Sequence, residues 1–161
     1  MEPMDVGLLG IGTVGGGTFR VLARNREEIS RRAGREIRIT RVADKDVERA
    51  RALVAGHTPA GSVPAQVTAD AFDVVRDPSV GIVVELIGGY GIARELVLEA
   101  IERGKHVVTA NKALLALHGN EIFARARERG VMVAFEAAVG GGIPIIKALR
   151  EGLTANRIEW I

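Results

Sequence analysis

The fold is decided by a glycine-rich stretch near the start of the chain, Gly10-Ile11-Gly12-Thr13-Val14-Gly15. It follows a short apolar strand pattern directly and opens a segment with the pattern of a helix, which is the setting of a dinucleotide-binding turn. We expect Gly10 to allow the tight turn, Gly12 to let the backbone approach a pyrophosphate, and Gly15 to let the helix pack on the strand. The N–H groups and the dipole at the start of that helix would attract the anion. The alternative is a glycine-rich turn that binds no ligand.

Apolar runs and helical patterns alternate along the rest of the chain. The runs predict strands at Val6–Leu9, Ile37–Ala43, Gly81–Ile87, His106–Thr109 and Val131–Phe135, with a further strand beginning at Ile158. Periodicity and stop signals predict helices around Val14–Arg32, Asp46–Val54, Asp70–Arg76, Ala93–Ile101, Ala113–Leu117, Asn120–Arg129 and Pro144–Glu151. Segment 57–69 is rich in turn-forming residues and is predicted to be a loop. The alternation predicts an α/β fold, a doubly wound, mostly parallel Rossmann-type sheet with helices on both faces.

The composition fits such a sheet and excludes several other classes of protein. The 161 residues are about one domain, and with 47% hydrophobic but only 4% aromatic residues the core must be aliphatic. The 22 basic and 20 acidic residues nearly cancel, so we expect no nucleic-acid partner. The absence of cysteine excludes a disulfide framework and a thiol nucleophile. We see no signal peptide and no apolar stretch approaching the roughly 20 residues that span a bilayer, so a cytoplasmic protein without membrane contact is expected.

Ligands of doubly wound sheets bind at the carboxyl ends of the strands, where five unusual segments are expected to converge. These segments are Gly10–Gly15, Asp44-Lys45, Ile87-Gly88-Gly89, Thr109-Ala110-Asn111-Lys112 and Glu136–Gly142. The Asp44 carboxylate is placed to accept hydrogen bonds from ribose hydroxyls, which favours NAD, although it follows Gly15 by 29 residues rather than about 20. Lys45 could instead meet the 2′-phosphate of NADP, and Asp44 could cap the next helix. Both cofactors therefore stay open.

Three charged residues are candidates for chemistry or for structural roles. Lys112, at the start of a helix on the ligand edge, could anchor a substrate or move a proton, and its alternative is a solvated surface charge. Glu85 lies inside an apolar strand and needs a hydrogen-bond partner if it is buried, which favours a structural role. Glu136 precedes a glycine run whose backbone could meet a cation or a substrate, or could simply turn into the last helix. The three histidines have no partner at motif spacing, and no zinc-ligand spacing is present.

Four blocks of the sequence together resemble the homoserine dehydrogenase family. They are Val6–Gly15, Val84–Gly89, Gly104–Leu115 and Glu136–Ile146, and the last three are far more specific than the first. The resemblance implies reversible hydride transfer between NAD or NADP and the L-homoserine/L-aspartate 4-semialdehyde pair. That step belongs to threonine, methionine and isoleucine biosynthesis. A homodimer is expected for the complete enzyme.

The resemblance and the strand-end argument together give a set of expected site residues. The expected cofactor contacts are Gly10, Ile11, Gly12, Thr13, Val14, Gly15, Asp44, Lys45, Ile87, Gly88, Gly89, Ala110 and Lys112. Lys112 is implied to be catalytic, as one of two lysines at the reacting centre. Glu136 and Gly140 are expected to bind substrate. A monovalent cation such as Na⁺ is implied at main-chain carbonyls, those of Glu136, Val139, Gly141 and Ile143.

The chain is shorter than members of that family. We expect residues 1–155 to form the dinucleotide-binding domain and 156–161 to begin the connection to a catalytic and dimerisation region, which would supply the second lysine and the acidic substrate ligands. The chain alone should bind cofactor with negligible turnover, and Trp160 should be an exposed anchor for that region. The alternatives are a dinucleotide-sensing module without catalysis and the cofactor domain of another dehydrogenase.

Overall fold

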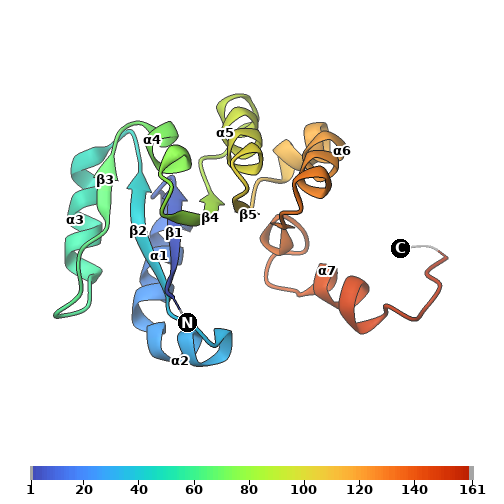
Figure 1. Cartoon of the computed structure of the whole chain (residues 1–161), viewed down its shortest axis with the longest axis horizontal. Helices are drawn as coiled ribbons and strands as arrows, with labels where there is room; N and C mark the ends of the chain where they lie inside the picture. Colours follow the sequence, from blue (N-terminus) through green and yellow to red (C-terminus); the bar gives the residue numbers. More distant parts are fainter. Residues whose placement is uncertain (1, 160–161) are drawn as a thin grey trace.

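Six parallel strands form the centre of the computed structural model, which describes residues 2–159 (Figure 1). The strands are β1 (Met4–Leu9), β2 (Ile37–Ala43), β3 (Gln66–Thr68), β4 (Val80–Glu85), β5 (His106–Thr109) and β6 (Val133–Ala134), in the sheet order β3-β2-β1-β4-β5-β6. The helices between them are α1 (Thr13–Arg24), α2 (Arg26–Ala33), α3 (Val47–His57), α4 (Ala71–Arg76), α5 (Gly91–Glu102) and α6 (Lys112–Arg129). This is the predicted Rossmann-type α/β fold, in which the strand order reverses beside β1.

Each face of the sheet has its own aliphatic core. On one face, Val74 of α4, Leu96 of α5 and Ile122 of α6 pack against alternate strand residues such as Leu9 and Val83. On the other face, Phe19 of α1 and Val54 of α3 pack against Leu8 and Val42. The crossovers therefore place α1 and α3 on one face of the sheet and α4 to α6 on the other; in Figure 1, α4 to α6 lie along the top of the molecule and α3 lies at its left. None of the helices within residues 2–159 is long and apolar enough to cross a bilayer.

The C-terminal part of the chain extends away from this body. A 3₁₀ turn, η1 (Glu136–Ala138), follows β6 and leads to α7 (Ile145–Lys147), which continues as a π-helical turn, η2 (Ala148–Gly152). In Figure 1 these elements lie beyond α6 rather than over the sheet. The strand expected from Ile158 is not seen among the described residues, since 157–159 have no regular structure, and Trp160 lies outside the described residues.

Two helix predictions were wrong in opposite directions. The helix expected over 14–32 is broken at Asn25, whose φ of −102° and ψ of 17° separate α1 from α2. Asn has low helix propensity, and α2 buries no residue that would compensate for it. Conversely, α6 runs unbroken through His118 and Gly119, where two helices were expected. Gly119 is buried and faces Phe123, so packing outweighs the low helix propensity of glycine.

The edge strands also differ from the prediction. Strand β3 lies inside the segment expected to be a loop, and its three residues pair in parallel with Arg41–Ala43. Strand β6 has two residues rather than the five expected. Both lie at the ends of the sheet, where a strand has only one partner and a short run gives little periodic signal.

Candidate functional site

The parallel pairing brings the five predicted strand ends to one edge of the sheet. Leu9 of β1 is paired with Ala43 of β2 on one side and with Glu85 of β4 on the other. Glu85 is in turn paired with Thr109 of β5. The segments that follow these residues therefore leave the sheet beside one another, with the segment after β6 one strand further along. The predicted convergence is confirmed.

The geometry of the glycine turn explains why it needs two of its glycines. Gly10 has a φ of +87°, and a Cβ there would lie 2.8 Å from the carbonyl oxygen of Leu86, so the turn passes close to the end of β4. A Cβ on Gly15 would lie 1.9 Å from the carbonyl oxygen of Gly10, so α1 could not start against β1. Both predicted backbone roles are confirmed.

The start of α1 is open in the way an anion site requires. A Cβ on Gly12 would meet no atom within 4 Å. Gly12 is the N-cap of α1, and no side chain caps the helix there. The first N–H groups of a helix have no acceptor inside the helix, so those of α1 point into this open space with the positive end of the dipole. The residues present therefore fit a pyrophosphate.

Asp44 ties the glycine turn to the end of β2. Its Oδ2 accepts a hydrogen bond of 2.7 Å from the N–H of Ile11, and its Oδ1 accepts one of 2.9 Å from the N–H of Asp46. The helix that follows is capped by Asp46 itself, which accepts from the N–H of Arg49, so Asp44 is not the cap of α3. A carboxylate has about four acceptor positions, so Asp44 keeps capacity for ribose hydroxyls. Lys45, beside it, is exposed.

A buried hydrogen-bond network joins the ends of β4 and β5. The Glu85 carboxylate, with no exposed surface, accepts from the N–H of Ile87 at 2.9 Å and from the hydroxyl of Thr109 at 2.7 Å. The Thr109 Oγ1 accepts from the N–H of Asn111, and the Asn111 amide donates to the carbonyl of Gly89. Asn111 also caps α6 by accepting from the N–H of Leu114. The structural role predicted for Glu85 is confirmed.

This network fixes the place of Lys112. Lys112 is the first residue of α6 and follows Asn111 directly, so its backbone is set by the buried cap while its side chain is exposed. Gly88 and Gly89, on the neighbouring turn, have φ values of +81° and +70° and are also exposed. Lys112 thus projects from a rigid base at the carboxyl edge.

The segment after β6 is organised by one side chain. The Glu136 carboxylate accepts hydrogen bonds of 2.9 Å from the N–H of Ile146 and 3.0 Å from the N–H of Lys147. These two bonds join the residue before the loop 137–144 to the start of α7, so the two ends of the loop are held together. Within residues 2–159 no cluster of three carboxylate or histidine side chains could hold a metal ion, so any cation here would depend on main-chain carbonyls.

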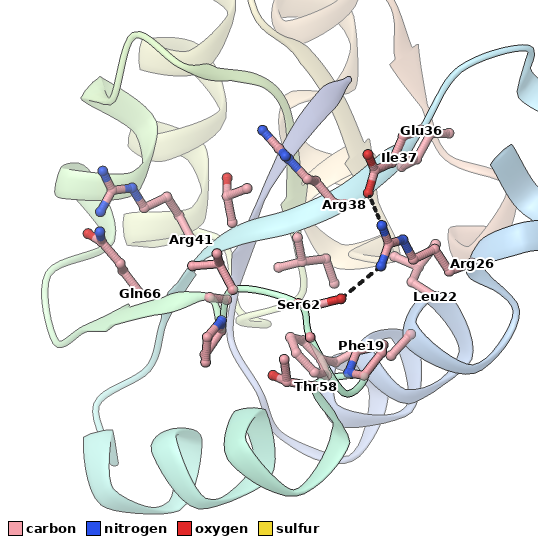
Figure 2. Close-up of a pocket in the computed structure, with 18 of the residues that line it drawn as sticks. Phe19, Leu22, Arg26, Glu36, Ile37, Arg38, Arg41, Thr58, Ser62 and Gln66 are labelled. Carbon is pink, nitrogen blue, oxygen red and sulfur yellow. Dashed lines mark hydrogen bonds and ion pairs between the residues drawn. The ribbon is translucent and has the colours of Figure 1, made fainter. Parts of the chain in front are cut away.

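A separate cavity lies away from this edge. A cavity of about 510 Å³ lies beside the amino half of β2, lined from α1, α2 and the segment 58–66, and none of the predicted site residues lines it. Figure 2 shows Arg26 at its rim, where the guanidinium bridges Glu36 at 2.6 Å and Ser62 at 2.8 Å. The three arginines that line it, Arg26, Arg38 and Arg41, each pair with a carboxylate. This cavity therefore does not lie at the edge of the sheet where the five predicted segments meet.

One buried charge escaped the sequence reasoning. Lys105, at the opposite end of β5, is buried and donates hydrogen bonds of 2.6 Å to the carbonyls of Asp77 and Val80. Burial lowers the pKa of its ammonium. In the sequence Lys105 stands between Gly104, which ends a helix, and a strand, and nothing in that pattern predicts that its side chain is buried. Its contacts tie the turn before β4 to β5, so its role is structural.

Comparisons with known proteins place this geometry in a family. The family profile described as "Homoserine dehydrogenase, NAD binding domain" matches residues 10–136. The chain belongs to this family. It is 62% identical over 161 residues to the homoserine dehydrogenase of Pseudomonas aeruginosa and 58% identical over 161 residues to that of Neisseria gonorrhoeae. In both comparisons the match covers 100% of this chain and 35% of the relative, so the chain spans about a third of the length of these relatives.

A solved structure gives the same result for the fold. The crystal structure of a homoserine dehydrogenase from Thiobacillus denitrificans matches with a TM-score of 0.89 and 65% sequence identity. The match covers 99% of this chain and 35% of that one. The family predicted from the four sequence blocks is therefore confirmed.

Proposed function

We propose that this chain is the cofactor-binding part of a homoserine dehydrogenase, which transfers a hydride between NAD(P) and the L-homoserine/L-aspartate 4-semialdehyde pair. The observation that carries the proposal is the open start of α1 behind a glycine turn that admits no side chain at Gly10 or Gly15. When bound, the nicotinamide supplies the hydride donor or acceptor. The residues of this chain hold that cofactor and present it to the substrate.

The cofactor is held along the edge from β2 to β5. The N–H groups of Thr13 and Val14 face the diphosphate, and Asp44 accepts from the adenosine ribose. The turn Ile87-Gly88-Gly89 and the residue Ala110 border the path beyond the diphosphate. Because Asp44 is fixed by two backbone N–H groups, it presents a carboxylate where a 2′-phosphate would lie, which favours NAD over NADP. Lys45 is the residue whose positive charge would offset the repulsion between the Asp44 carboxylate and a 2′-phosphate.

Lys112 is proposed as a catalytic residue. It stands on the cap formed by Asn111, where an ammonium can hold the substrate oxygen or carry the proton that accompanies hydride transfer. The second lysine and the acidic groups for the substrate amine are proposed to come from the larger part of the enzyme. This chain alone should therefore bind cofactor with negligible turnover.

Glu136 and its loop are proposed to shape the substrate and cation sites. The carboxylate is already used by the N–H groups of Ile146 and Lys147, so it acts by fixing the loop that contains Gly140. A monovalent cation would be held by the carbonyls of Glu136, Val139, Gly141 and Ile143. The Glu136 carbonyl also accepts from Val139, and that of Ile143 from Ile145, which leaves each a second lone pair for a cation.

The complete enzyme is proposed to be a cytoplasmic homodimer that acts on small molecules and binds no nucleic acid. Support comes from the near-zero net charge, +2, and from the absence of a membrane-spanning helix within residues 2–159.

The test of the catalytic proposal is a full-length chimera, in which this chain replaces the equivalent third of the Pseudomonas aeruginosa relative. Lys112→Ala should lower kcat by about 100-fold or more, as expected for loss of an acid–base group, with little change in cofactor affinity. The exposed Arg127→Ala, near the other end of α6, serves as the control. Equal activity of the two variants would overturn the catalytic role of Lys112. Absence of homoserine oxidation in the unsubstituted chimera would overturn the proposed reaction.

A further inference from the structure

The cavity beside β2 lies where the sheet has a gap. Strand β3 pairs with β2 only over Arg41–Ala43, so within residues 2–159 no strand pairs with the amino half of β2 on that side. A backward extension of β3 would pass through Pro64, which has no N–H to donate to a ladder. The segment 58–65 and the amino half of β2 instead line a cavity of about 510 Å³. This volume is in the usual range of a small-molecule site, about 300–1,000 Å³.

A β-bulge leaves one hydroxyl of the cavity wall without a partner. The pairing of β2 with β1 steps from Val6 and Ile39 to Gly7 and Arg41, so Thr40 is the extra residue of a bulge. Thr40 lines the cavity, and its buried Oγ1 has no hydrogen-bond partner within residues 2–159. Buried polar atoms are nearly always hydrogen-bonded, and a molecule in the cavity would supply the missing partner. Bulges are also frequent beside functional sites.

Positive charge lies on both sides of the cavity. Three arginines and one glutamate, Glu36, line it, so its lining carries an excess of two positive charges. Arg26 and Arg41 lie on opposite sides in Figure 2. Arg26 donates to Glu36 and Ser62 through its terminal nitrogens, and Arg41 contacts Asp77 through Nε at 2.6 Å. A guanidinium has five N–H donors, so both arginines keep donors for a further acceptor.

Other lining residues make the cavity suitable for a hydrocarbon chain. Phe19 and Leu22 of α1 and Ile37 and Ile39 of β2 contribute apolar surface. All four belong to or pack against the core on this face of the sheet, except that Leu22 lies one turn further along α1. A ligand that satisfies both the arginines and this surface has anionic ends and an aliphatic middle.

We propose that this cavity binds a small aliphatic dianion, with one carboxylate on Arg26, the other on Arg41 and the hydrocarbon chain against Phe19 and Ile39. A carboxylate matches the fork of a guanidinium, and such charge-assisted hydrogen bonds are about twice as strong as neutral ones. The site is separate from the proposed cofactor edge, because none of the predicted site residues lines it. The proposal therefore does not depend on the proposed reaction.

The experiment is a calorimetric titration with a series of dicarboxylates of increasing length: succinate, glutarate, adipate, pimelate and suberate. It uses the full-length chimera with the Pseudomonas aeruginosa relative and the 161-residue chain, at constant ionic strength. Hexanoate, which has the chain length of adipate but one carboxylate, is the ligand control. Arg26→Gln and Arg41→Gln test the two ends, and the exposed Arg127→Gln is the matched control. Lys112→Ala reports any binding at the cofactor edge.

The expected result is saturable binding in both proteins, with an affinity that passes through a maximum as the chain lengthens. Hexanoate should bind at least about tenfold more weakly than adipate, and each cavity arginine variant should lose at least about tenfold, since a hydrogen bond to a charged group is commonly worth that much. Arg127→Gln and Lys112→Ala should bind as the unsubstituted protein does. Thr40→Val, which keeps the shape and the charge of the wall, should weaken binding a few-fold, and it decides the matter if an arginine variant does not fold.

Four results overturn the proposal. They are no saturable binding of any dicarboxylate, an affinity that does not change with chain length, binding that is lost in Lys112→Ala but kept in both cavity arginine variants, and binding by the isolated chain but not by the chimera. In the last case the rest of the enzyme covers the cavity. NAD is titrated in parallel, so that normal NAD binding without dicarboxylate binding refutes this proposal and leaves the proposed function standing.

Discussion

Two loops on the ligand edge, one after β1 and one after β6, are held in different ways. The glycine turn 10–15 is fixed by the packing of the domain, because Gly10 touches the end of β4 and Gly15 touches Gly10. The loop 137–144 is fixed by the single carboxylate of Glu136, and most of its residues are exposed. The cofactor-binding part of the edge is therefore preorganised by the core of this domain. The loop after β6 depends on one side chain.

The largest expected effect on cofactor binding comes from adding one methyl group to the glycine turn. Gly15→Ala would place a Cβ 1.9 Å from the Gly10 carbonyl, so the turn or α1 must shift. Overpacking of this kind costs about 1–3 kcal/mol, so we expect NAD affinity to fall by about 100-fold in a calorimetric titration. Gly17→Ala, whose Cβ meets nothing within 4 Å, is the control and should bind NAD normally. Equal affinity of the two variants would show that packing does not set the turn.

The next effect concerns the buried hydrogen-bond network around Glu85, which joins the ends of β4 and β5. Glu85→Ala removes the acceptor of the Thr109 hydroxyl and of the Ile87 N–H. Leaving buried donors without acceptors costs about 1–3 kcal/mol for each group, so the free energy of unfolding should fall by about 3 kcal/mol. Urea unfolding measures this change. The exposed Glu128→Ala should change the free energy of unfolding little, and a similarly small change in Glu85→Ala would contradict the buried network.

A smaller and local effect is expected at the far loop. Glu136→Gln weakens the bonds to the N–H groups of Ile146 and Lys147 and should lower the free energy of unfolding by about 1 kcal/mol or less. Hydrogen exchange should speed up at these two amides and in residues 137–144, while NAD affinity stays unchanged. If NAD affinity falls as far as it does in Gly15→Ala, the two loops are not independent and the comparison fails.

The smallest effect is on acid stability. The ion pairs from Arg129 and Arg125 of α6 lower the pKa of Glu102 on α5 below its ordinary value of 4.5. A carboxyl group whose pKa is lower in the folded than in the unfolded protein stabilises the folded state when the pH is above the unfolded pKa. This stabilisation is lost as the pH falls through the folded pKa. Glu102→Gln should therefore lower the Tm slightly at pH 7 and by a smaller amount at pH 3. A larger loss of Tm in Glu102→Gln at pH 3 than at pH 7 would contradict the predicted direction of the pH dependence.

The first strand, the glycine turn and the start of α1 were predictable because local pattern and tertiary packing agree there. The apolar strand, the glycine turn and the following helix over residues 6–24 each carry a strong signal of their own. Sequence alone failed where the structure depends on distant contacts. The pairing of β3 with Arg41–Ala43 is a contact that no local window contains, and the continuity of α6 through Gly119 depends on the burial of that glycine. The site residues converge as predicted, but the bond from Asp44 to Ile11 joins positions 33 residues apart and has no local signature.

The most direct test of the account is a titration of the 161-residue chain with NAD and with NADP under identical conditions. We expect saturable binding at one site, tighter for NAD than for NADP, with the preference reduced in Asp44→Ser because the fixed carboxylate is gone. Binding of neither dinucleotide by the folded chain would contradict the claim that the start of α1 is a diphosphate site.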